Sequence, residues 1–303
     1  MNFFDGAWLR RSKAGSAAIA AFVATILSGA GAAMAATIEG APRDWQLGFQ
    51  RPGSESMEML ESFHNHMLLP ITTAISVFVL LLLIIVIVRF NKGANPVPSK
   101  NAHNTLIEVL WTVVPVMILV AIAIPSFRLL FFEARLPAAD VTLKATGNTW
   151  NWDYEYPDLG DIQFKAVMVP PDQLKPGQPK LLTTDNKVVV PVGKVIRVQT
   201  TANDVIHSWA VPAFGVKMDA MPGRLNETWF KAEREGIYYG QCSELCGTDH
   251  AFMPIEVHVV SEDLFKQWVE AAKSDVDKAN QVLAAAEGSP LTFAAATPAG
   301  SAQ

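Results

Sequence analysis

Four side chains that bind soft metals lie within twelve consecutive residues. Cys242 and Cys246, the only cysteines of the chain, are followed by His250 and Met253. Thiolate, imidazole and thioether ligands suit copper better than any hard cation. A single-copper site needs one thiolate, so a second cysteine four residues away indicates two metals that share both sulfurs. His207 supplies a second imidazole from upstream, which completes a set sufficient for two copper ions.

Three other interpretations of the cysteine loop are open. An exported protein with two cysteines can oxidise them to a disulfide, although a bridge across so short a loop adds little stability. The cysteines and His250 could instead hold structural zinc, with His207 or His258 as the fourth ligand. His250 and Met253 could also be ordinary loop and core residues. Copper is the working hypothesis, because neither a disulfide nor zinc requires Met253.

The N-terminal residues have the pattern of a secretory signal peptide. Basic residues between Arg10 and Lys13 precede an uncharged, alanine-rich run that ends at Ala33-Met34-Ala35. A basic start, an apolar middle and a small-x-small cleavage site are typical of such peptides. We predict a signal peptide over residues 1–35. A third membrane span is the alternative, although the run has few large aliphatic side chains.

Two further segments are long enough to cross a bilayer, which takes about 20 apolar residues. Residues 67–88 form an uncharged run of 22. Residues 106–132 contain a second uncharged run of 19, which includes two prolines that a membrane helix tolerates. The loop 89–105 is basic and should be cytoplasmic, and segment 36–66 is acidic and should be exported. The sequence thus predicts a two-helix transmembrane hairpin in a lipid bilayer.

The part of the chain after the hairpin has the patterns of an exported, all-β domain at 137–260. Short β-branched runs alternate with Gly, Pro and Asn, which is typical of a β-sandwich. The cysteine loop should join two of these strands at one end of the sandwich. From Pro137 onward there are 21 acidic and 14 basic residues, a net charge of −7. Such a domain attracts basic partners and repels nucleic acid.

Two details of the C-terminal region follow from side-chain periodicity. Ile255, Val257 and Val259 should face the core, so Glu256 and His258 should point outward, and His258 is not expected to be a ligand. Apolar residues recur at helical spacing over 261–287, which predicts one amphipathic helix. The uncharged tail 288–303 should be disordered.

Five motifs in order make the chain resemble subunit II of the haem-copper cytochrome c oxidases. They are Glu108-Val-Leu-Trp111 through Pro115, Trp150-Asn-Trp152-Asp-Tyr154, Asp204-Val-Ile-His207-Ser-Trp209, Met221-Pro-Gly-Arg224 and the cysteine loop. The resemblance implies a two-helix transmembrane hairpin followed by an all-β, cupredoxin-like sandwich that carries a binuclear copper centre called CuA.

The resemblance also assigns ligands. It implies that His207, Cys242, Cys246, His250 and Met253 bind two copper ions through their side chains. Glu244 would offer its backbone carbonyl to copper and its carboxylate to Mg²⁺ (or Mn²⁺) shared with the catalytic subunit, because a hard cation prefers oxygen ligands. The alternative for Glu244 is a solvated loop acid.

Other residues gain roles from the same resemblance. Trp150 would accept the electron from cytochrome c, although alternation of aromatic residues from 150 to 156 could equally mark one buried face. The sequence departs from the commonest family pattern with Asn148, Thr149 and Asn151 around this tryptophan. Glu108 would form the entrance to a proton channel of the neighbouring subunit, or else a simple interfacial anchor. Four acids match the docking patch for cytochrome c, namely Glu155, Asp158, Asp161 and Asp204.

The resemblance therefore implies a subunit of a respiratory, proton-pumping oxidoreductase in a bacterial inner membrane, with its copper domain in the periplasm. Subunits I and III would be its partners, cytochrome c its electron donor, and oxygen would be reduced in another subunit. A quinol oxidase subunit would lack the copper ligands, nitrous oxide reductase would need a large extra domain, and a copper carrier would need neither spans nor Trp150. The electron-accepting subunit of a nitric oxide reductase stays open as the alternative.

Overall fold

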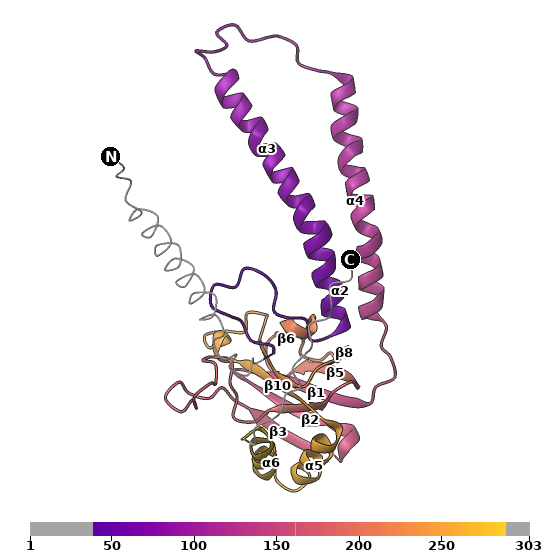
Figure 1. Cartoon of the computed structure of the whole chain (residues 1–303), viewed down its shortest axis with the longest axis vertical. Helices are drawn as coiled ribbons and strands as arrows, with labels where there is room; N and C mark the ends of the chain where they lie inside the picture. The colour runs from indigo at the N-terminus through magenta and orange to yellow at the C-terminus, as the bar shows by residue number, and fades with distance from the viewer. Residues whose placement is uncertain (1–38, 161, 289–303) are drawn as a thin grey trace, which may run out of the picture. The chain divides into compact units, whose positions relative to one another are not determined.

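The computed structural model describes residues 39–160 and 162–288. The predicted signal peptide, Asp161 and the predicted tail after Gly288 lie outside these residues. In the described part, two long apolar helices precede a β-sheet domain, as the sequence predicts (Figure 1).

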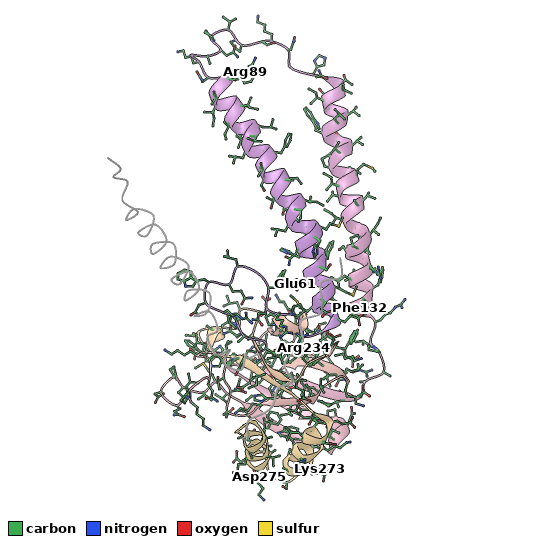
Figure 2. The ribbon with its side chains drawn as sticks, in the orientation of Figure 1. Glu61, Arg89, Phe132, Arg234, Lys273 and Asp275 are labelled. Carbon is green, nitrogen blue, oxygen red and sulfur yellow. The ribbon has the colours of Figure 1, made fainter. Side chains whose placement is uncertain are left out.

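Two helical segments are long and apolar enough to cross a membrane, and none of the residues in their most apolar stretches is buried. The first comprises α2 (Glu55–Phe63), a π-helical turn (His64–Leu68) and α3 (Leu69–Arg89), and the second is α4 (Thr105–Ala134). Figure 2 shows Arg89 at the end of α3. Apolar side chains cover all sides of α3 and α4, which is the pattern of helices surrounded by lipid.

Polar caps decide where these helices begin. Ser54 accepts a hydrogen bond from Met57 N–H at 3.2 Å, and Glu55 and Glu58 occupy the first turn of α2. Acidic residues there interact favourably with the helix dipole. The first helix therefore begins well before Met67, where the apolar run starts. Asn104 caps α4 in the same way through Ile107 N–H.

Within residues 137–160 and 162–260, ten strands build the β-sheet domain. They are β1 (Val141–Asn148), β2 (Asn151–Tyr156), β3 (Ile162–Ala166), β4 (Val188–Pro191), β5 (Val195–Ala202), β6 (His207–Val211), β7 (Val216–Ala220), β8 (Asn226–Lys231), β9 (Gly236–Gln241) and β10 (Pro254–Val260). One sheet has the order β3-β2-β1-β5-β8, a second has the order β4-β10-β9, and β6 pairs with β7. The cysteine loop joins β9 to β10, as predicted.

Alternating side chains of these strands fill one core. On β2, Trp152, Tyr154 and Tyr156 are buried while the residues between them are partly exposed. Their polar atoms mostly find partners: Trp209 Nε1–H donates to Tyr154 Oη at 3.2 Å, and Tyr156 Oη–H donates to Val189 O at 2.9 Å. Burial raises the pKa of both tyrosines. The β2 aromatics thus form a hydrogen-bonded part of the core that also includes both cysteines.

The prediction that Glu256 and His258 point to solvent is wrong, because both side chains are buried. They do occupy the face of β10 opposite Ile255 and Val257, but the chain before β4 covers that face. Glu256 Oε2 accepts Thr184 N–H at 2.7 Å, and Glu256 Oε1 lies 2.8 Å from His258 Nε2. The pair anchors a connecting segment to the sheet.

Removing the Glu256 carboxylate should destabilise the domain. Glu256→Ala leaves Thr184 N–H without this acceptor and deprives His258 of its carboxylate partner, and a buried donor without an acceptor costs about 1–3 kcal/mol. Glu256→Gln keeps one acceptor oxygen and should cost less. Guanidinium unfolding of the chain in detergent should give midpoints in the order parent, Gln, Ala, and an unchanged midpoint for the alanine variant would refute the anchor.

The C-terminal region forms two helices where the sequence predicts one. These are α5 (Glu262–Ala272) and α6 (Val276–Gly288), and Figure 2 shows Lys273 and Asp275 at the turn between them. Asp275 accounts for the break, because its carboxylate accepts Asp277 N–H at 2.9 Å and so starts a new helix. The apolar faces of both helices are buried, as predicted, through Phe265, Trp268, Val269, Ala272, Ala279 and Leu283.

Candidate metal centre

The cysteine loop is closed at its base and tied to a neighbouring strand. Cys242 N–H donates to Met253 O at 3.0 Å, which joins the two ends of the loop. Ser243 N–H donates to Ser208 O at 3.0 Å, which holds the loop beside β6. His207 is the first residue of β6, so these backbone bonds bring it to the cysteines although 35 residues separate it from Cys242.

The two sulfurs face each other as free thiols. Cys242 Sγ and Cys246 Sγ lie 3.8 Å apart, and both residues are buried. A disulfide requires about 2.05 Å between its sulfurs. The disulfide interpretation therefore fails for this structure. Because thiolate–metal bonds are about 2.3 Å long in zinc sites, one ion of similar size can reach both sulfurs.

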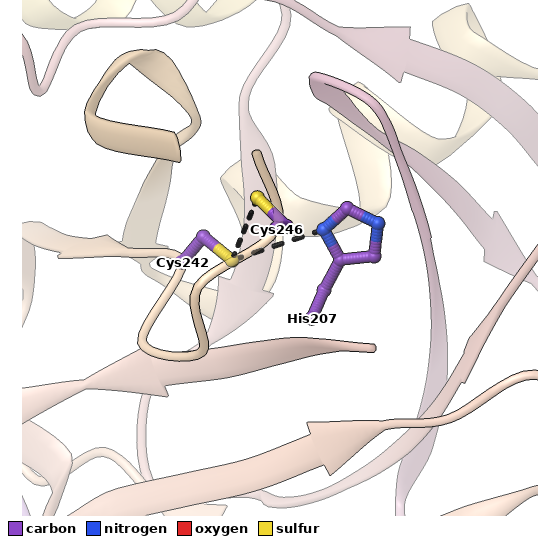
Figure 3. Close-up of side chains that lie close together, drawn as sticks. All are labelled: His207, Cys242 and Cys246. Atoms are coloured by element: carbon purple, nitrogen blue, oxygen red, sulfur yellow. Dashed lines mark hydrogen bonds between the residues drawn. The ribbon is translucent and has the colours of Figure 1, made fainter. Parts of the chain in front are cut away.

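Each sulfur has an imidazole beside it. His207 Nδ1 lies 3.8 Å from Cys242 Sγ, and His250 Nδ1 lies 3.5 Å from Cys246 Sγ. The candidate ligand atoms of His207, Cys242 and Cys246 all lie within 4.8 Å of one another (Figure 3). The two sulfurs lie next to each other, and each has one imidazole nitrogen beside it. This arrangement matches the donor set for two soft metal ions. His258, the other candidate zinc ligand, instead contacts Glu256.

The remaining predicted ligands also lie on this loop. Met253 is buried in the core that includes both cysteines. The Glu244 carbonyl oxygen lies 3.4 Å from Cys242 Sγ, and the Glu244 side chain is exposed at the surface of the loop. Glu244 thus directs its carbonyl inward and leaves its carboxylate accessible from outside.

The thiols differ in acidity. Burial acts to raise the pKa of Cys242, but hydrogen bonds, first that with His207, lower it to about 7. Burial raises the pKa of Cys246 to about 12, and the charge of the neighbouring Cys242 adds to the effect. The two sulfurs therefore differ in how readily they become thiolates, the form that binds a metal. A cation that binds both sulfurs must displace the protons that the thiols carry.

Asp204 contacts the predicted copper ligand His207. The sequence did not predict this contact and assigned Asp204 only to the docking of cytochrome c. Asp204 Oδ1 lies 2.8 Å from His207 Nε2, and Asp204 Oδ2 accepts Thr149 N–H and Thr149 Oγ1–H. Burial acts to raise the pKa of Asp204, but these bonds, first that with His207, hold it well below its usual range. The one sequence feature that could have indicated this contact is the position of Asp204, three residues before the predicted histidine ligand.

Trp150 lies over the cysteine loop. It precedes β2 and is half-buried, unlike Trp152, so the alternating aromatics combine one surface residue with a buried face. A side chain added at Gly247 would start 3.1 Å from Trp150 Cζ2. Gly247 has a φ of +125°, which L side chains rarely adopt. The glycine therefore permits the close approach between the indole and the loop.

Three of the other predicted residues make local contacts. Glu155 pairs with Lys144 at 2.9 Å, and Asp158 accepts Thr142 N–H at 3.0 Å. Glu108 lies in the first turn of α4 and accepts Asn104 N–H at 3.1 Å. Each contact also provides a structural role for the residue.

Gly147→Ala should weaken metal binding without altering a ligand. A Cβ at this position would lie 2.6 Å from His207 Cδ2 and 2.8 Å from His207 Cγ, so the imidazole must shift. We expect the chain to retain copper against a competing chelator about 10- to 100-fold less well, as when a partner of a metal ligand is lost. Gly48→Ala is the matched control, because no atom lies within 4 Å of its added Cβ. Equal retention by both variants would contradict the prediction.

Comparisons with known proteins agree along the chain. Residues 141–260 match the family described as cytochrome C oxidase subunit II, periplasmic domain, and residues 42–129 match its transmembrane domain. A probable cytochrome c oxidase subunit 2 of Rickettsia bellii is 53% identical over 78% of this chain and 87% of its own. Cytochrome c oxidase subunit 2 of Cereibacter sphaeroides is 45% identical over 82% of this chain and 87% of its own.

A solved structure is also similar. The crystal structure of the periplasmic domain of subunit II of cytochrome oxidase of Bradyrhizobium japonicum shares 59% sequence identity, covers 47% of this chain and 99% of that chain, and has a TM-score of 0.44. Two family matches that together cover both the helices and the β-sheet domain, with relatives similar over most of their length, establish the family. The chain belongs to the cytochrome c oxidase subunit II family.

Proposed function

We propose that the chain is the electron-accepting subunit of a respiratory cytochrome c oxidase and that its cysteine loop holds a binuclear copper centre. The observation that carries the proposal is the pair of free sulfurs 3.8 Å apart, each with an imidazole nitrogen within 3.8 Å. His207, Cys242, Cys246 and His250 would ligate copper, and Met253 and the Glu244 carbonyl would be weaker ligands that tune the potential.

The donor set suits electron transfer. Two copper ions held by both thiolates would share one unpaired electron, so a change of charge would alter each bond little and the reorganisation cost would stay low. The protein contributes rigidity, because the loop is closed at its base and both cysteines belong to the same buried core as the β2 aromatics. Oxygen reduction and proton pumping would belong to the catalytic subunit.

The surroundings of the loop would connect it to its partners. Trp150, half-buried above Gly247, would receive electrons from cytochrome c. The exposed carboxylate of Glu244 would bind Mg²⁺ or Mn²⁺ at the border with the catalytic subunit. Glu108, at the basic-loop end of α4, would form the proton-channel entrance, and a Glu108→Gln variant should then turn over more slowly. The partners would be subunits I and III in a bacterial inner membrane, with the β-sheet domain in the periplasm.

Purification through a tag on this chain tests the assignment. The chain should bring with it a multi-span haem protein, and the complex should oxidise reduced cytochrome c while consuming oxygen. Relatives named as cytochrome c oxidase subunits favour this over a nitric oxide reductase. Activity with nitric oxide and none with oxygen would reverse that choice. A chain that purifies alone with exchangeable copper would refute the proposal.

Neutralising docking acids should slow association with a basic cytochrome c. The double variant Glu155→Gln, Asp158→Asn removes two negative charges near β2, so we expect an association rate about two- to tenfold lower at low salt. The difference should shrink as salt screens the field. Stopped-flow reduction across an ionic-strength series measures it, with the double variant Asp263→Asn, Glu270→Gln on α5 as a charge-matched control. Equal rates for the double variant, control and parent would remove the docking role.

A further inference from the structure

Asp204 joins the two loops that carry a predicted copper ligand and the predicted electron acceptor. Its Oδ1 lies 2.8 Å from His207 Nε2, and its Oδ2 accepts Thr149 N–H at 2.6 Å and Thr149 Oγ1–H at 2.8 Å. Thr149 directly precedes Trp150. One carboxylate therefore contacts both the imidazole and the segment that positions the indole.

The hydrogen bond also selects the tautomer of His207. An ionised carboxylate only accepts hydrogen bonds, so His207 Nε2 carries a proton, and in the neutral imidazole that binds a metal Nδ1 then presents its lone pair. Nδ1 is the atom that faces Cys242 Sγ, at 3.8 Å. The hydrogen bond to Asp204 thus orients the His207 ring so that Nδ1 points toward the sulfurs of Cys242 and Cys246.

We propose that Asp204 is a positioning residue of the copper centre. Its carboxylate fixes the position of the His207 imidazole relative to the Thr149–Trp150 segment. The inference rests on the proposed function. It differs from a docking role, in which only the charge of Asp204 would matter. A carboxylate bonded to a ligating histidine also raises the basicity of the ring and so favours the oxidised metal.

Two variants separate geometry from charge. Asp204→Asn keeps the shape and removes the charge, whereas Asp204→Glu keeps the charge and displaces the carboxylate by one methylene. A positioning role predicts that both variants change the centre, while a docking role predicts that only the asparagine variant loses association rate and that neither changes the centre.

A neighbouring residue supplies a matched control. Asn203 links the same two loops, since its Nδ2–H donates to Asn148 Oδ1 at 2.8 Å, and its backbone N–H donates to Gly147 O. Asn203→Ala removes the side-chain link and leaves the contacts of Asp204 intact. Any effect that arises only from loosening these loops should appear in this variant as well.

The test uses the purified complex that contains the full chain, with copper content under chelator competition, the copper electron paramagnetic resonance signal and the reduction potential as readouts. Both Asp204 variants should retain copper about 10- to 100-fold less well and show altered hyperfine splitting. The asparagine variant should also have a higher potential, by about 59 mV for each tenfold change in relative affinity of the two oxidation states. Asn203→Ala should resemble the parent.

Any other pattern overturns the inference. Asp204 variants with an unaltered signal and potential, beside a parent that shows the two-copper signal, refute it and leave the proposed function intact. An Asn203→Ala variant that changes as much as the Asp204 variants reduces the role to general loop structure and also refutes it. A parent without the two-copper signal refutes the proposed function and this inference together.

Discussion

A complex that carries Cys246→Ser should lose its two-copper centre and accept electrons from cytochrome c more than about 100-fold more slowly. Losing a bridging ligand should exceed the 10- to 100-fold effect typical of an outer-shell partner. Serine has nearly the size of cysteine, so the buried site should keep its shape. Its hydroxyl, however, is not a soft anionic ligand and cannot bridge two copper ions as a thiolate does.

The neighbouring residues offer a control within the same loop. Ser243 is exposed, and its side chain donates to Gln241 O at 3.2 Å. Ser243→Ala should therefore keep both copper ions and the parent rate, while Cys242→Ser should match Cys246→Ser. Metal analysis together with stopped-flow reduction measures both effects. Full copper content and a parent rate in either serine variant would show that the cysteines do not ligate copper.

Trp150→Phe should slow reduction by cytochrome c by about 100-fold, or ~2.7 kcal/mol on the activation barrier, with copper content unchanged. The indole is half-buried against Gly247, so it lies between the surface and the cysteine loop. A smaller ring leaves a gap in this path and replaces none of the predicted ligands. The combination of a slow rate with an intact copper signal distinguishes electron acceptance from a structural role.

A second tryptophan of the domain serves as the control. Trp229 lies on β8, where its Nε1–H donates to Glu133 O at 3.1 Å at the end of α4. Trp229→Phe removes the same number of atoms and should leave the reduction rate unchanged. Stopped-flow traces at several cytochrome c concentrations give the comparison. Similar rates for the two phenylalanine variants would contradict the role of Trp150.

Much of this fold could be predicted because local patterns and the family resemblance point the same way. The two long uncharged runs predict α3 and α4, and the β-branched runs predict strands such as β1, β5 and β10. The helix starts were harder, because Ser54 caps the first helix well before the apolar run begins. The break between α5 and α6 depends on one capping aspartate. The apolar periodicity, which is judged over many residues, does not reveal the effect of a single residue.

Buried polar groups show the limit of reasoning from alternation. Glu256 and His258 occupy the face of β10 that the period assigns to them, but that face is covered by a connecting segment that carries Thr184. The pattern of residues around β10 cannot reveal that a segment 72 residues away in the sequence covers this face. The same limit applied to Asp204, whose contacts with Thr149 span 55 residues. The cysteine loop was recognisable because its chemistry lies within one short stretch of sequence.

Electron paramagnetic resonance of the oxidised, purified complex tests the central claim most directly. Two bridging thiolates beside two imidazoles predict a copper signal from one unpaired electron shared equally by two copper nuclei, and that signal should disappear in Cys246→Ser. Splitting by a single copper nucleus, or the absence of any signal from this chain because it holds zinc, would contradict the claim.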